Sequence, residues 1–236
     1  MNTGLRLVFG SCAVGGLALI AAGLYVWGAK EVRGDLGEVM LLTLAGGVWL
    51  LLAAKLFPWL GLSLRDDVAE RGNIAALVGL CGALTAFALI YVGGSLGEGP
   101  SYANNFFSVA LGSAGLLVLW ILLEVGGQVS MSVAEERDLA SGLRLSGFLL
   151  AIGLILGRAV AGDWHSEEAT VHDFFRDGWP AIVLWAFALI IERCTRPNRQ
   201  VPFPRWPTRG LLPASLYLAL TAAWLWHLGP WEGMPK

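Results

Sequence analysis

Long runs of apolar residues alternate with short polar connections along the whole chain. Runs of about 18 or more residues with few charges are long enough, at 1.5 Å per residue, to cross ~30 Å of hydrocarbon as α-helices. The connections between the runs leave no room for a soluble domain. We therefore predict an all-α integral membrane protein with about seven transmembrane helices, over residues 5–28, 38–63, 73–94, 105–127, 139–161, 178–193 and 210–228.

The sixth run is the shortest, and Pro180 lies near its start. Proline costs little in the first turn of a helix, where its missing N–H has no helical partner. We expect this helix to begin earlier than the apolar run, near Phe174, at the end of an external loop over residues 162–178.

Composition and charge support a membrane protein and exclude several other classes. Hydrophobic residues make up 56% of the chain and charged residues 14%, with a mean hydropathy of +0.64. Soluble domains carry about 25% charged residues, so this chain has too few to cover a water-facing surface. The net charge of −2 gives no indication of nucleic-acid binding. The three cysteines have no paired or metal-type spacing, and we expect no disulfide, metal or cofactor.

The distribution of lysine and arginine predicts the orientation in the membrane, because short cytoplasmic loops carry an excess of both. The connections after the second, fourth and sixth runs carry arginines, whereas those after the third and fifth carry no lysine or arginine over residues 94–104 and 162–172. Lys30 and Arg33, after the first run, are the exception. We expect a cytoplasmic N-terminus and an external C-terminus.

A gap-free repeat at a spacing of 68 relates residues 67–124 to residues 135–192. Because each copy holds two apolar runs, the unit is a hairpin of two helices, and copies in the same orientation are parallel repeats. We predict hairpin repeats over 64–127 and 132–195, a degenerate third copy over 1–63, and a basic, proline-rich connection with a final transmembrane helix over 196–236. The repeat pairs Asp67 with Glu135, Glu70 with Asp138, Asn73 with Ser141 and Glu124 with Glu192.

The first copy opens with DDVAERGNIAA over residues 66–76, followed by Gly79. This pattern of an acid, Gly-Asn, Ala-Ala and Gly resembles the two-helix repeat of bacterial membrane proteins in the domain of unknown function 350 family. The resemblance implies a bacterial inner-membrane protein without established chemistry, some of whose relatives are associated with membrane stress. The second copy departs from the pattern at Ser141 and Arg144. The candidate motif residues are Asp67, Glu70, Gly72, Asn73, Gly79, Glu135, Asp138 and Gly147.

Two acidic residues, Glu124 and Glu192, end apolar runs where the helix dipole disfavours an anion. An acid at the edge of the hydrocarbon needs a partner, and Arg144 lies at the same depth in the fifth run. We predict a cytoplasmic-side cluster of Arg144, Glu124 and Glu192, joined by Asn73. The alternative is that each side chain extends separately to the headgroups, as we expect for Lys55 and Arg158. The acids before the third and fifth runs suit helix caps and first turns, and the alternative for Asn73 is likewise a helix cap.

Basic and aromatic residues share the connection over residues 195–209, whose prolines preclude a helix. Arginines beside aromatic rings suit anionic headgroups, and the same segment suits docking of a cytoplasmic partner. The candidate lipid or partner contacts are Arg196, Arg199, Arg205 and Trp206. The loop over 162–178 carries histidines and acids at spacings that match no established metal site, so we interpret it as a solvated acidic loop.

The sequence has no nucleophile with its base, phosphate-cradling glycine loop or H-E-x-x-H helix. We therefore expect a non-catalytic membrane component, acting as a structural or partner-recruiting subunit of an envelope assembly. Its partners would be membrane lipids and either further copies of itself or the other subunits of a complex. The alternative is a small oligomeric channel or transporter, suggested by the repeats and by the expected charge cluster.

Overall fold

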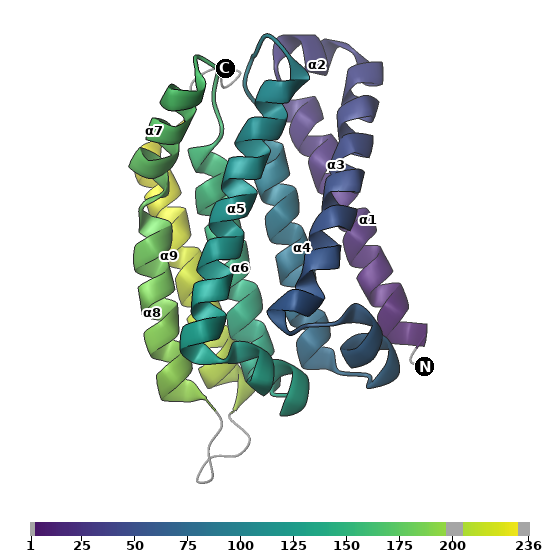
Figure 1. Cartoon of the computed structure of the whole chain (residues 1–236), viewed down its shortest axis with the longest axis vertical. Helices are drawn as coiled ribbons and strands as arrows, with labels where there is room; N and C mark the ends of the chain where they lie inside the picture. The colour runs from purple at the N-terminus through teal and green to yellow at the C-terminus, as the bar shows by residue number, and fades with distance from the viewer. Residues whose placement is uncertain (1–2, 197–204, 231–236) are drawn as a thin grey trace.

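A computed structural model of the chain describes residues 3–196 and 205–230, and these residues contain helices and no strand (Figure 1). Within these two ranges, six helices are long and apolar enough to cross a membrane, and a bent pair can form a seventh span. The prediction of an all-α multi-pass membrane protein is thus confirmed. The helices are α1 (Thr3–Trp27), α2 (Lys30–Gly34), α3 (Leu36–Leu56), α4 (Ile74–Gly94), α5 (Tyr102–Gly127), α6 (Leu139–Ala159), α7 (Glu167–Gly178), α8 (Pro180–Thr195) and α9 (Leu212–Leu228).

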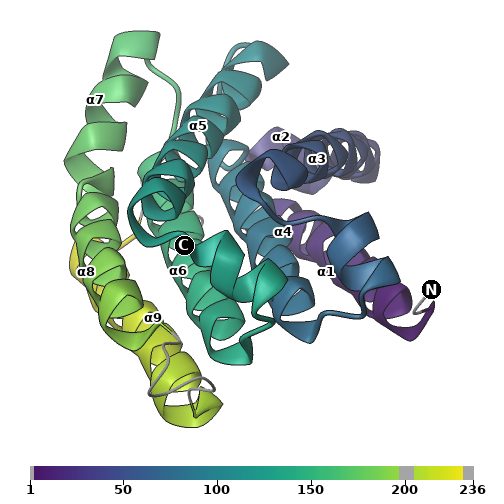
Figure 2. The same ribbon diagram turned by 60° about the horizontal axis from the view of Figure 1, so that its bottom comes forward.

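Four helices that run in the same direction, α1, α4, α6 and α9, form a row in which each packs on the next (Figure 2). The helices that return, α3, α5 and the α7–α8 pair, pack along this row. We call the end where α1, α4, α6 and α9 begin the basal end, and the end where they finish the distal end (Figure 1).

The centre of the row is the α4–α6 pair, where small residues let the two backbones approach closely. In each of these helices 72% of the most apolar stretch is buried, compared with 22% in the spans of α1 and α9 and 28% in that of α3. A Cβ atom on Gly153 would lie 2.8 Å from the Cα of Ala86, and one on Gly157 would lie 2.8 Å from the carbonyl oxygen of Leu89. Close backbone contact supplies the dispersion energy that holds helices together where lipid is as apolar as leucine.

The two copies of the hairpin are related by a spacing of 65 in their first helices, so the predicted spacing of 68 is wrong there. The helices α4 and α6 have equal length and begin at Ile74 and Leu139 respectively. The amide of Asn73 donates to the Asp67 carbonyl, and the amide of Asp138 donates to the Ser132 carbonyl, both at 2.9 Å. This register also aligns two identical tripeptides, at positions 68–70 and 133–135, each with the sequence Val-Ala-Glu.

The error of three residues has a simple cause, since three residues are close to one turn of 3.6. A shift of almost one turn keeps apolar and small residues near the same face, so the wrong register still matches. In the correct register Asn73 aligns with Asp138, Gly79 with Arg144, and Gly82 with Gly147.

The spacing of 68 returns in the second half of each hairpin. The helices α5 and α7 keep the spacing of 65 at their starts, which follow Ser101 and Ser166. The ends of α5 and α8, at Gly127 and Thr195, instead follow the spacing of 68. Three additional residues therefore lie in the second copy, within the α7–α8 pair, which is bent by 42°. Pro180 occupies the first turn of α8, as the sequence predicts.

The expected loop over 162–178 is mostly helix, because α7 begins at Glu167 and not near Phe174. The Ser166 hydroxyl accepts a hydrogen bond from the Ala169 amide at 3.1 Å. Glu167 and Glu168 follow in the first turn, where the helix dipole favours anions. A serine cap and first-turn acids are strong start signals, and they outweigh the polar composition of this segment.

Short π-helical segments precede three of the four row helices, at Leu64–Glu70, Met131–Glu135 and Pro207–Leu211. Asp67 lies inside the first segment, where its carboxylate accepts from the Ser63 amide at 2.8 Å. It is therefore neither the cap nor a first-turn acid of α4. That cap is Asn73, and Asp138 caps α6 in the same way.

The close α4–α6 contact can be tested with glycine variants. We expect Gly153→Ala to lower the free energy of unfolding by about 1–3 kcal/mol, because the added methyl group meets the Ala86 backbone. Gly15→Ala on α1 is the matched control, since nothing lies within 4 Å of its added Cβ. It should stabilise slightly, by about 0.5–1 kcal/mol. Unfolding in mixed micelles measures both, and equal effects would contradict the close contact.

The register that aligns α4 with α6 makes a second prediction. Gly72 and Arg137 occupy the same place before α4 and α6, with φ of 65° and 55°. A non-glycine residue in the left-handed region costs about 1–3 kcal/mol, and glycine lowers stability through the unfolded chain by about 0.4–1 kcal/mol. Arg137→Gly should therefore raise the free energy of unfolding, by up to about 2.5 kcal/mol, and Gly72→Arg should lower it. A fall for Arg137→Gly, or a rise for Gly72→Arg, would show that the two positions are not equivalent.

Candidate functional site

A buried ion pair joins Arg144 of α6 to Glu192 of α8 at the basal end. Nε of Arg144 lies 2.6 Å from Oε2 of Glu192, and Nη2 donates to Oε1 at 2.8 Å. The two side chains are 2% and 4% exposed. Such parallel charge-assisted hydrogen bonds are the strong form of an arginine–carboxylate contact. The structure thus brings together two members of the expected cluster.

The remaining donors of Arg144 reach two further elements. Nη1 donates to the carbonyl of Arg209 at 2.5 Å, in the π-helical segment that precedes α9. Nη2 also donates to Ser141 Oγ at 2.8 Å, and Ser141 in turn donates to Asp138 at 2.6 Å. One guanidinium therefore connects α6, α8 and the start of α9, and we call Arg144, Glu192, Ser141 and the Arg209 carbonyl the basal clamp.

The electrostatics of the basal clamp follow from its burial. A lone ion inside a bilayer is costly, and charged side chains there pair with one another or with backbone carbonyls. Breaking a buried pair by removing one partner leaves the other charge uncompensated. In the clamp the opposite charges meet at hydrogen-bonding distance, so neither faces hydrocarbon alone.

The first copy of the repeat cannot accommodate a clamp of this kind. The position of Arg144 is occupied in α4 by Gly79, whose Cβ would lie 3.3 Å from Leu145 and 3.5 Å from Leu62. There is no space for a long side chain at that place, because α6 packs against it. Arg144 instead faces the side of α6 that carries α8 and α9.

Glu124 does not belong to the basal clamp, contrary to the prediction. Its two carboxylate oxygens accept from the amide and the hydroxyl of Ser130, at 2.8 and 2.5 Å. The left-handed residue Gln128 ends α5 and turns the chain so that Ser130 returns to the carboxylate. Local turn geometry therefore supplies the partner that sequence spacing assigned to Arg144.

Asn73 also lies outside the basal clamp, because it caps α4 and holds the second copy to the first. Its side-chain oxygen accepts from the Ala76 amide at 3.2 Å. Its amide group donates to the carbonyls of Val133 and Ala134, at 2.7 and 3.2 Å. A buried side chain that bonds both copies fixes how the hairpins sit together.

The other motif residues are either exposed acids or glycines packed between helices. Glu70 forms an exposed pair with Arg65 at 3.2 Å, and Glu135 is exposed. Exposed pairs of this kind contribute about 0–1 kcal/mol. Gly79 and Gly147 are buried in the helix contacts.

Three of the four residues expected to contact lipid or a partner are described, and Arg199 lies outside the described residues. Arg196 donates to the Gln128 side chain at 3.0 Å and lies 3.2 Å from the sulfur of Met131. Arg205 and Trp206 are exposed at the basal end.

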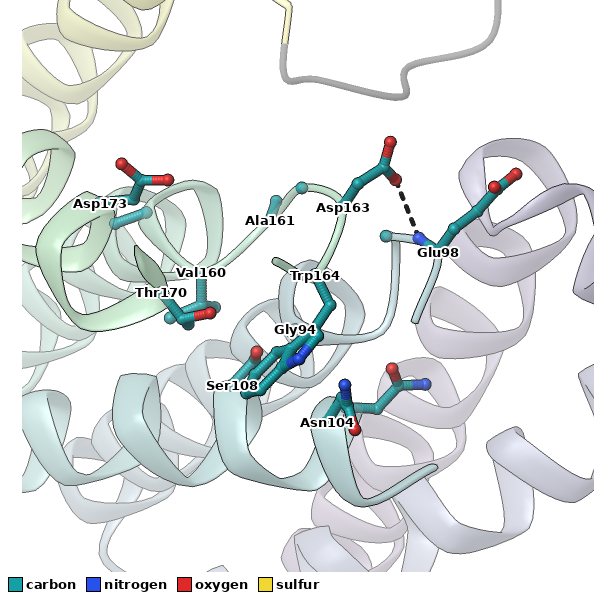
Figure 3. A pocket seen from close by; sticks show the side chains of 14 residues that line it. Gly94, Glu98, Asn104, Ser108, Val160, Ala161, Asp163, Trp164, Thr170 and Asp173 are labelled. Carbon is teal, nitrogen blue, oxygen red and sulfur yellow. Dashed lines mark hydrogen bonds between the residues drawn. The ribbon is translucent and has the colours of Figure 1, made fainter. Parts of the chain in front are cut away.

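A small polar pocket lies at the distal end, between the α4–α5 and α6–α7 connections (Figure 3). Its volume is about 40 Å³, and a buried water needs about 10–15 Å³. The Glu98 amide donates to Asp163 at 2.9 Å, and the Trp164 amide donates to the Glu98 carbonyl at 2.8 Å. Trp164 also packs edge-on against Phe107. The residues around the pocket therefore connect the two hairpins.

No sequence signal marks this pocket, because its polar lining comes from loop backbone and from single residues such as Asn104 and Ser108. Within residues 3–196 and 205–230, no three histidine, cysteine, aspartate or glutamate side chains are grouped to hold a metal ion.

Arg158 is the second charge inside α6, and its expected extension to the headgroups stays a prediction. Its side chain is 15% exposed and lies 3.7 Å from Asp177. Lys55, which was expected to behave in the same way, is exposed.

Comparisons of the chain with protein-family models, with curated proteins and with solved structures found no match. The resemblance to the domain of unknown function 350 family therefore stays a prediction.

The basal clamp predicts a large loss of stability when its arginine is removed. Arg144→Met should lower the free energy of unfolding by about 3–5 kcal/mol, because Glu192 would keep a buried charge without its partner. Arg65→Met is the matched control on an exposed pair and should change stability by less than about 1 kcal/mol. Comparable losses in the two variants, measured by unfolding in mixed micelles, would exclude a clamp.

Proposed function

We propose that this chain is a non-catalytic multi-pass protein of the bacterial inner membrane, acting as a structural or partner-recruiting subunit of an envelope assembly. The proposal places the basal end in the cytoplasm and the distal end outside. The basal end supports this, since Arg65, Arg71, Arg137, Arg196 and Arg205 lie in its connections and cytoplasmic loops favour arginine. The association with membrane stress rests on the family resemblance alone.

The observation that carries the proposal is the contrast between the centre of the bundle and its flanks. The α4–α6 pair is closely packed, and the basal clamp fixes α8 and α9 to it. The flanking helices expose large apolar side chains, such as Leu44 on α3 and Leu212 on α9, each more than 60% accessible. Because the closely packed centre is satisfied within the chain, the outward faces of α3 and α9 stay available for packing against other membrane helices.

The alternative, a small oligomeric channel or transporter, has less support. It was suggested by a charge cluster of Arg144, Glu124 and Glu192 that would face a shared axis. In the structure Arg144 and Glu192 neutralise each other in a buried site. Glu124 instead accepts hydrogen bonds from Ser130, in the turn that follows α5. The charges that motivated transport are thus engaged within one chain.

The mass of the particle released from native membranes in mild detergent tests the proposal. We expect native mass spectrometry to find an assembly, either several copies of this chain or this chain with another protein. A particle that is monomeric and free of other proteins under these conditions would contradict the proposal.

Two variants identify the flank that is used. Leu44→Trp and Leu212→Trp each enlarge an exposed side chain, on α3 and α9 respectively. We expect one variant to weaken the assembly and the other to leave it intact as a size-matched control. Loss of assembly in both, with normal stability of the single chain, would indicate that both flanks are occupied.

A further inference from the structure

An apolar groove opens at the distal end between the last turns of α1, α4, α6 and α9. Its volume is about 630 Å³, within the range of about 300–1,000 Å³ typical of small-ligand sites. The groove is lined by leucine, valine and glycine, with Trp27 and Trp226 on either side, and Arg158 is the one charged side chain among the described residues that line it. Tryptophan concentrates at membrane–water interfaces, so this end of the groove lies near the headgroup level.

Arg158 is poorly bonded compared with the arginine of the basal clamp. Its guanidinium lies 3.7 Å from Asp177 and 3.4 Å from the Pro230 carbonyl, and its Nε is buried with no partner among the described residues. Asp177 is already held by Arg176, at 2.8 and 3.2 Å. An arginine offers five N–H donors, and by contrast the hydrogen bonds that Arg144 donates lie between 2.5 and 2.8 Å.

Arg158 lies near the distal end of α6, from where its long side chain can reach the headgroup region. It lies fourteen residues after Arg144, or about 21 Å along the helix axis, and in the last turn of α6. Two arginines separated by this distance lie close to the opposite boundaries of a ~30 Å hydrocarbon layer. Arg144 is neutralised by Glu192 at 2.6 Å, whereas Arg158 lies 3.7 Å from Asp177 and borders an apolar groove.

We propose that the groove binds one membrane phospholipid, with an acyl chain along α4 and α6 and the phosphate on Arg158. The apolar lining, to which Leu154 contributes, fits the acyl chain. The weakly bonded guanidinium complements the phosphate, because arginine recognises phosphate through several N–H donors at once. The proposal does not depend on whether the chain forms an assembly, so it can fail or hold independently of the proposed function.

Native mass spectrometry of the detergent-purified full chain with added phosphatidylglycerol tests the proposal. We expect one lipid to remain bound at activation energies that remove surface lipids. Arg158→Gln should weaken retention by about tenfold or more, as expected for loss of charge-assisted hydrogen bonds. Leu154→Trp should weaken it by filling the groove, and Arg65→Gln at the basal end is the arginine control that should leave retention unchanged.

Three outcomes would overturn the proposal. The first is equal retention by the wild type, Arg158→Gln and Leu154→Trp, with thermal unfolding showing that all three are folded. The second is displacement of the bound lipid by millimolar inorganic phosphate, which would mean that only an anion is recognised. The third is binding that appears only in a chain ending at Pro230, which would make residues 231–236 the natural occupant.

Discussion

Hydrocarbon offers no polar partner, and this constraint organises the molecule. A buried charge is costly unless a partner within the chain, or a ligand that binds to it, compensates the charge. Helix association must come from close packing, since burial of apolar surface from lipid gains little. The glycines of α4 and α6 provide this close packing. The basal clamp provides the polar partners for Arg144 and Glu192.

The same constraint distinguishes the two arginines of α6. Both lie in a helix whose apolar stretch is 72% buried, yet their surroundings differ. Arg144 faces a carboxylate and a carbonyl at short range, so its charge is used to hold helices together. Arg158 faces an apolar groove with long contacts only. The first therefore has a structural role, and the second is suited to an anion that the membrane supplies.

The sequence predicted the helices well because each needs only an apolar run of sufficient length. It predicted Arg144 beside Glu192 because both lie at the same depth and neither could remain alone in hydrocarbon. It failed for Glu124, since a left-handed Gln128 and the returning Ser130 are properties of a turn that no periodicity reveals. It also failed by three residues in the repeat, because helical faces change little over almost one turn. The distal groove could not be predicted, since it forms where four separate helices end.

If the buried charges of Arg144 and Glu192 hold the helices together, a double-mutant cycle between these two residues will show it in the stability of the protein. The four proteins are the wild type, Arg144→Met, Glu192→Leu and the double variant, compared by their free energies of unfolding. We expect the double variant to be more stable than at least one single variant, because the second change removes a buried, unpaired charge. Losses that simply add would show that the two residues act independently and would contradict the clamp.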